Sequence, residues 1–102
     1  RPHHAGMTRI EIELYAERLS RHAERLRDDL DGARMRLAWL DLERSARDEL
    51  GARDTAVLES LGVLTGTDEA SERRLVDRRL RQLEVVERFQ ALVERELDGL
   101  AG

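Results

Sequence analysis

The sequence predicts an all-α fold: a long antiparallel helical hairpin with coiled-coil character and a short helix at its tip. Of the 102 residues, 39% are charged, 40% are apolar and only 3% are aromatic, so the core must be built from aliphatic side chains. Leucine, alanine, glutamate and arginine dominate, a composition typical of long helices. Apolar residues also recur at heptad spacing. Residues 1–7 are expected to be a disordered tail or a cloning remnant, and residues 8–102 a single domain.

The first helix is predicted from residue 8 to residue 50, with Thr8 as its N-cap. Apolar residues follow one another at alternating steps of four and three, which defines a heptad seam. Gly32 lies inside this pattern without shifting its phase. We therefore expect one continuous helix through Gly32, although a mid-helix glycine costs about 1 kcal/mol relative to alanine. The seam consists of Ile12, Ala16, Leu19, Ala23, Leu26, Leu30, Ala33, Leu37 and Leu40.

A second apolar line runs along the same predicted helix after residue 34. Its members are spaced four, three and four residues apart, on a face that the first seam leaves outward. Two seams on one helix require two neighbours, so we expect this half of the helix to lie between two partners. The second line consists of Met35, Trp39, Leu42 and Ala46.

Gly51 is predicted to end the first helix as a C-cap with a positive φ angle. A short helix is predicted to follow over residues 55–61, with Asp54 as its N-cap. Its apolar side chains indicate a packed tip of the hairpin. The tip then connects to the last helix through a glycine- and threonine-containing break at residues 65–67.

The last helix is predicted over residues 68–98, with Thr67 as its N-cap and Gly99 as its end. Its heptad seam contains two polar exceptions, Arg79 and Gln90. A buried amide in a coiled-coil seam commonly fixes register and helix order at some cost in stability. Gln90 is therefore predicted to specify the register of the hairpin. The apolar seam positions are Val76, Leu83, Val86, Val93, Leu97 and Leu100.

Three arginines are predicted to meet at one level of the hairpin. Counting from the tip, Arg79 falls at the level of residues 41–47, where Arg44 and Arg47 continue the seam of the first helix. Guanidinium groups bind phosphate and carboxylate groups in a bidentate fashion, so the three can form an anion or nucleotide site. The alternative, which is the more common arrangement at seam edges, is a network of ion pairs with neighbouring acidic side chains.

Composition and spacing disfavour several classes of function. The net charge of −4 argues against a nucleic-acid partner. The chain has no cysteine, and His22 lacks the partner spacing of a metal site. No nucleophile elbow, phosphate loop or dinucleotide motif occurs. We therefore expect no enzyme activity, no cofactor and no bound metal. We also expect a cytoplasmic location and no membrane contact, because no apolar run is long enough to span a bilayer.

The predicted helix lengths indicate self-association. At 1.5 Å per residue the first helix is about 64 Å long and the last about 46 Å long. If the two helices meet at the tip, about twelve N-terminal residues of the first helix overhang. The overhang would expose Ile12, Tyr15, Ala16 and Leu19. A twofold dimer would bury this seam together with the second apolar line.

The sequence therefore predicts a non-enzymatic helical interaction module, a bacterial homodimeric scaffold or regulatory adaptor. Its expected partner is a second copy of the chain, and another helical protein is the next candidate. The alternative function is a ligand-responsive regulator that binds an anion or nucleotide through Arg44, Arg47 and Arg79.

Overall fold

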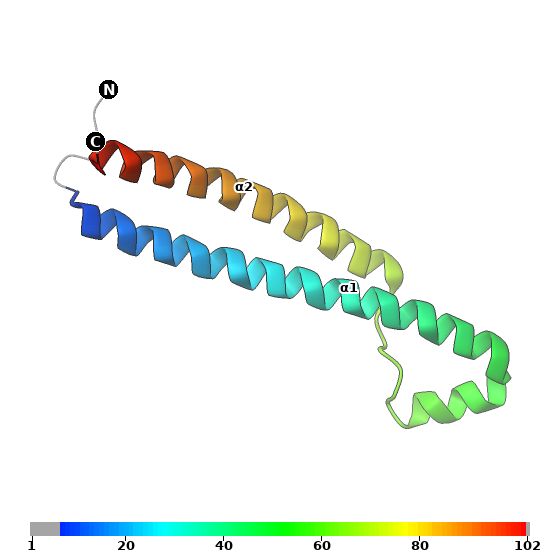
Figure 1. Ribbon diagram of the computed structural model, residues 1–102. Coiled ribbons are helices and arrows are strands. Elements are labelled where there is room, and N and C mark those ends of the chain that lie inside the picture. Colours follow the sequence, from blue (N-terminus) through cyan, green and yellow to red (C-terminus); the bar gives the residue numbers. More distant parts are fainter. Residues whose placement is uncertain (1–6, 102) are drawn as a thin grey trace. The chain divides into compact units, whose positions relative to one another are not determined.

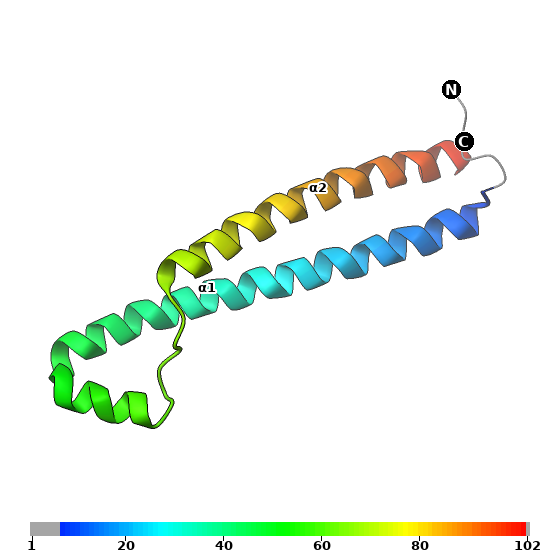
Figure 2. The same cartoon turned by 180° about the vertical axis from the view of Figure 1, so that it is seen from behind.

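The computed structural model describes residues 7–101, which form two long helices and a connecting segment (Figure 1). Helix α1 spans Arg9–Ser60 and helix α2 spans Glu69–Ala101, with no strand among the described residues. The chain divides into unit 1, Arg1–Asp28 with Leu80–Gly102, and unit 2, Asp29–Arg79. In each unit a segment of α1 packs antiparallel against a segment of α2 (Figure 1, Figure 2). The predicted all-α helical hairpin is confirmed.

Helix α1 begins with a capping box. The hydroxyl oxygen of Thr8 accepts a hydrogen bond from the backbone N–H of Glu11 at 3.2 Å, and the Glu11 carboxylate accepts one from the N–H of Thr8 at 2.9 Å. This reciprocal pair satisfies two of the N–H groups that a helix start leaves open. Thr8 is thus confirmed as the N-cap. Residues 1–6 of the predicted tail lie outside the described residues, and the single-domain assignment of residues 8–102 stays a prediction.

Helix α1 passes through Gly32 and is interrupted at Gly51. Gly32 lies within α1 and has no positive φ angle, as predicted. Gly51 has φ 82° and ψ 175°, so the regular helix stops there and a tip helix follows over residues 52–60. The predicted stop at Gly51 is therefore confirmed. The predicted N-cap Asp54 is wrong, because the tip helix starts directly after the glycine and Asp54 lies inside it.

Helix α2 begins one residue later than predicted. The carboxylate of Asp68 accepts a hydrogen bond from the backbone N–H of Ser71 at 2.8 Å, so Asp68 is the N-cap in place of Thr67. The side chain of Thr67 instead donates to the Glu72 carboxylate at 3.3 Å. At the other end, α2 continues past Gly99, which has no positive φ angle. The predicted stop at Gly99 is wrong, since glycine ends a helix only where the backbone turns left-handed.

The heptad seam forms the core of each unit. In unit 1, Ile12 and Leu19 of α1 are buried against Val93 of α2, with Ala16 and Leu97 packed around them. In unit 2, the buried apolar residues come from the same seam of α1, at Leu30 and Ala33. The seam positions predicted from spacing are therefore the ones that the structure buries.

The predicted N-terminal overhang of the first helix is wrong. In unit 1, Nη1 of Arg9 donates to the carbonyl oxygen of Leu97 at 3.4 Å, so α2 reaches the first turn of α1. In unit 2, Nη2 of Arg44 lies 3.2 Å from Oε2 of Glu69, the first residue of α2. The tip helix and residues 61–68 lead the chain back along α1 before α2 begins (Figure 2). The segment of α1 that extends past α2 is therefore the one next to the tip.

Candidate functional site

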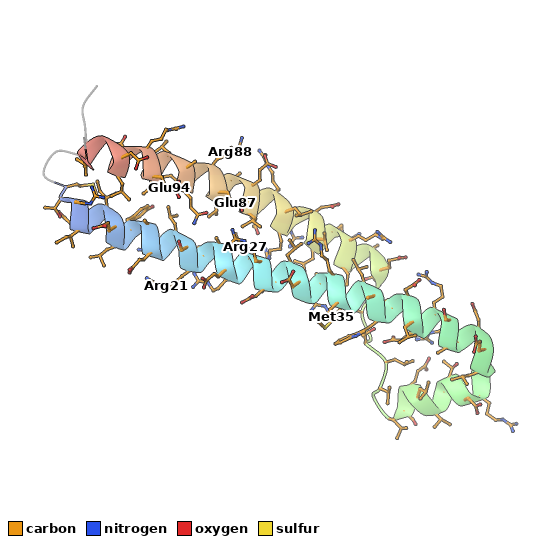
Figure 3. All side chains as sticks on the ribbon, viewed as in Figure 1. Arg21, Arg27, Met35, Glu87, Arg88 and Glu94 are labelled. Atoms are coloured by element: carbon orange, nitrogen blue, oxygen red, sulfur yellow. The ribbon has the colours of Figure 1, made fainter. Side chains whose placement is uncertain are left out.

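Three large apolar side chains of the predicted second line lie exposed on α1 in unit 2. The exposed fractions are 53% for Met35, 48% for Trp39 and 69% for Leu42, while Ala46 is half-buried. Steps of four and three residues place them on one side of the helix. Figure 3 shows Met35 on the side of α1 that points away from α2. Together with Val63 of the connecting segment, which is 61% exposed, these three residues are termed the Trp39 surface.

The Trp39 surface is open because α2 uses the opposite side of α1. Leu30 and Ala33 belong to the first seam and are buried in unit 2. Arg36 reinforces this contact, with its Nε 2.8 Å from Oε2 of Glu72, whose side chain is only 9% exposed. One helix can cover one seam, so the second apolar line of α1 has no covering helix among the described residues.

The connecting segment forms one edge of the Trp39 surface. The Glu43 carboxylate accepts a hydrogen bond from the backbone N–H of Thr65 at 3.2 Å and another from the Thr65 hydroxyl at 3.0 Å. These bonds hold Val63 beside Trp39 and Leu42, with which it lines a shallow hollow. No periodicity in the sequence connects Val63 with this part of α1, because the segment between the two helices is irregular. Sequence reasoning therefore missed Val63.

The other predicted interface residues lie in unit 1, where the structure divides them. Ile12 and Leu19 are 7% and 8% exposed because they form the core of the unit, and Ala16 is half-buried beside them. These residues serve the contact between α1 and α2 and are not an open seam. Tyr15 is exposed, and its ring meets that of Phe89 edge-on, with centroids 5.7 Å apart. Tyr15 alone among them presents an accessible side chain.

The structure does not bring Arg44, Arg47 and Arg79 together. Nε of Arg79 lies 3.2 Å from Oδ2 of Asp29, which is roughly 22 Å of helix away from Arg44. Arg44 pairs with the first residue of α2, and Nη1 of Arg47 lies 2.9 Å from Oε1 of Glu59 in the tip helix. The predicted common level is wrong because it assumed that α2 starts at the tip. Each guanidinium meets a carboxylate, as the ion-pair alternative proposed, although the carboxylates differ from those expected.

Two polar side chains interrupt the apolar interior. Gln90 is half-buried in unit 1 at its seam position, and its role in setting the register stays a prediction. Thr55 of the tip helix is only 7% exposed, and its buried hydroxyl has no hydrogen-bond partner among the described residues. A buried hydroxyl without a partner destabilises the folded state, because water satisfies it in the unfolded chain.

The acids with altered pKa values lie at the starts of the helices. Hydrogen bonds from the backbone and the hydroxyl of Thr8 lower the pKa of Glu11. Hydrogen bonds from the hydroxyl and the backbone of Ser71 lower the pKa of Asp68. Both carboxylates are exposed and accept bonds from open N–H groups of a helix start, which favours the ionised form. These pKa shifts therefore reflect helix capping.

The described residues provide no evident metal centre. Within residues 7–101, no three histidine, cysteine, aspartate or glutamate side chains are arranged to hold a metal ion. His22 contacts Arg25, whose Nη2 lies 2.8 Å from Nδ1 of the imidazole. Neither helix, over the part of the chain that the structure describes, has an apolar stretch long enough to cross a bilayer.

Comparison with known proteins gives no relative. No protein-family model, no curated protein and no solved structure matches this chain. The argument for function therefore starts from the Trp39 surface itself.

Proposed function

We propose that this chain is a non-enzymatic helical interaction module that forms a homodimer through the Trp39 surface, and that it acts as a scaffold or regulatory adaptor. The observation that carries the proposal is the adjacent exposure of Met35, Trp39 and Leu42 on one side of α1. Single exposed apolar residues are normal on protein surfaces, whereas a contiguous apolar patch commonly marks an interaction site. Tryptophan and methionine are also enriched at interfaces between proteins.

The Trp39 surface also has a rigid frame, which favours binding. Its helical residues belong to a segment whose opposite side is fixed by the core of unit 2, and its edge is fixed by the bonds between Glu43 and Thr65. A surface that is ordered before binding loses less conformational entropy on association. A second copy is the occupant that we favour, because a twofold contact covers the same patch on both chains at once.

Light scattering coupled to size exclusion tests the proposal at micromolar concentration. We expect twice the chain mass of 11.7 kDa for the unmodified protein. Leu42→Glu places a charge in the Trp39 surface and should reduce the mass to that of one chain. Leu61→Glu is the matched control, because Leu61 is 68% exposed, almost as much as Leu42 at 69%, but lies outside this surface.

The control should remain a dimer. A single-chain mass for the unmodified protein at every concentration would refute the homodimer. Equal dissociation of both variants would refute the assignment of the interface to the Trp39 surface.

A further inference from the structure

We infer that two copies pair through antiparallel α1 segments related by a twofold axis that passes between Leu40 and Asp41. In this arrangement Trp39 of each chain lies opposite Leu42 of the other, and Met35 lies opposite Ala46. The inference rests on the proposed homodimer and specifies its geometry. It uses only residues of unit 2.

The spacing of the second apolar line is self-complementary. Its steps of four, three and four residues read the same in both directions along α1. When a second copy runs antiparallel, every apolar residue of the line therefore meets an apolar residue of its partner. A twofold pair built in this way is closed, since each copy uses the same patch and no further copy can be added.

The antiparallel pair also matches large side chains with small ones. Met35 meets Ala46 and Trp39 meets Leu42, so each of the four layers has one larger and one smaller member. A parallel pair in register would place Trp39 against Trp39 and Ala46 against Ala46. Side chains pack densely only when their volumes fill the space between the helices evenly, which favours the antiparallel pair.

Charge distribution along the edges of the line favours the same direction. In an antiparallel pair the same edge of each helix meets its counterpart, so Arg36 of one copy lies next to Glu43 of the other. Both side chains are held in place within their own chain, Arg36 by Glu72 and Glu43 by Thr65. The opposite edge brings Ala38 next to Ser45, two small residues that allow the helices to approach closely.

A parallel pair would produce a repulsive contact at the end of the line. Glu49 follows Leu42 by seven residues and lies on the same side of α1. In a parallel pair the two copies of Glu49 would face each other, which is unfavourable for like charges. In the antiparallel pair Glu49 faces Gly32, which has no side chain to oppose it.

Disulfide cross-linking tests this arrangement, because the chain contains no cysteine of its own. The probes are two single variants, Met35→Cys and Ala46→Cys, oxidised separately and as an equimolar mixture. A disulfide requires Cα atoms within about 7 Å. In the antiparallel pair, Met35 and its own counterpart lie about 16 Å apart along the helix, as do the two copies of Ala46. Neither single variant should therefore cross-link alone, whereas the mixture should give a covalent dimer.

The possible outcomes separate this inference from the proposed function. Cross-linking in the mixture alone supports the antiparallel pair. Cross-linking of Met35→Cys by itself refutes it and indicates a parallel pair. A dimeric mass in light scattering without cross-linking in the mixture also refutes this geometry, yet leaves the homodimer in place. A single-chain mass refutes both.

Discussion

A glycine-to-alanine exchange should have opposite effects at two positions of α1. Gly51 has φ 82° and ψ 175°, a region that is accessible almost only to glycine, whereas Gly32 lies in regular helix. Alanine at position 51 should destabilise the fold by about 1–3 kcal/mol, because its Cβ is strained in that conformation. Alanine at position 32 should stabilise the helix by up to about 1 kcal/mol.

The surroundings of the two glycines set these magnitudes. A Cβ atom at position 32 would lie 3.3 Å from Nη1 of Arg36, the far end of a flexible side chain that can move by a few tenths of an ångström. A Cβ atom at position 51 meets no atom within 4 Å, so the cost there comes from the backbone alone. The chain could avoid the strain by straightening α1. That would separate Arg47 from Glu59, which are 2.9 Å apart across the kink, by about 18 Å.

Thermal unfolding followed by circular dichroism, at one fixed protein concentration, measures both effects. A change of 1 kcal/mol shifts the midpoint of a domain of this size by about 4–8 °C. We expect a lower midpoint for Gly51→Ala and a higher one for Gly32→Ala. A midpoint raised by Gly51→Ala would show that α1 runs straight through this residue and would refute the kink. A large decrease for Gly32→Ala would refute the continuous helix.

Three further predictions concern polar groups. Thr55→Val should raise the midpoint by removing an unpaired buried hydroxyl at nearly constant volume, worth about 1–3 kcal/mol, whereas Thr55→Ser, which keeps the hydroxyl, should not. In urea unfolding, Glu72→Ala should cost about 1–3 kcal/mol, because its carboxylate is buried. Glu87→Ala, which breaks the exposed pair with Arg27 that is visible in Figure 3, should cost less than about 1 kcal/mol; equal costs would contradict this. Since the pKa of Asp68 is lowered on folding, its stabilising effect is complete above the unfolded pKa and is lost as the pH falls through the folded value. Midpoints of the parent protein and Asp68→Asn, measured from pH 7 down to about pH 2, should therefore converge as the pH falls, and a constant difference would contradict the lowered pKa.

The parts of the fold that depend on nearest neighbours along the chain could be predicted from the sequence. The heptad seam specified which residues are buried, from Ile12 to Ala33, because burial on a helix follows its periodicity. Thr8 and Gly51 were identified as helix boundaries, because hydrogen-bonding side chains and glycine act locally there. The second apolar line around Trp39 was recognised in the same way, and its exposure follows from the absence of a covering helix.

The pairing between the two helices could not be predicted, because it depends on the path of the connecting segment. That segment has no periodicity, and the prediction assumed that the helices meet at the tip. The structure places Glu69 beside Arg44, well before the tip, so every residue of α2 is paired with an earlier residue of α1 than expected. This single shift accounts for the misplaced Arg79 and for the predicted overhang at Ile12. An error in one loop is carried along the full length of a hairpin, since both helices are rigid.

The two apolar seams of α1 connect the stability of the protein with its association. A hairpin of two helices supplies one neighbour for α1, and that neighbour covers the seam of Leu30 and Ala33. The buried core is consequently thin, and a small domain with little buried apolar surface is only marginally stable. A second copy over the Trp39 surface would add buried area to the segment of α1 that extends past α2. Because such a contact exists only between folded chains, association would stabilise the fold by mass action. Self-association and folding of unit 2 would then be linked, and a partner that competes for the Trp39 surface would act on both.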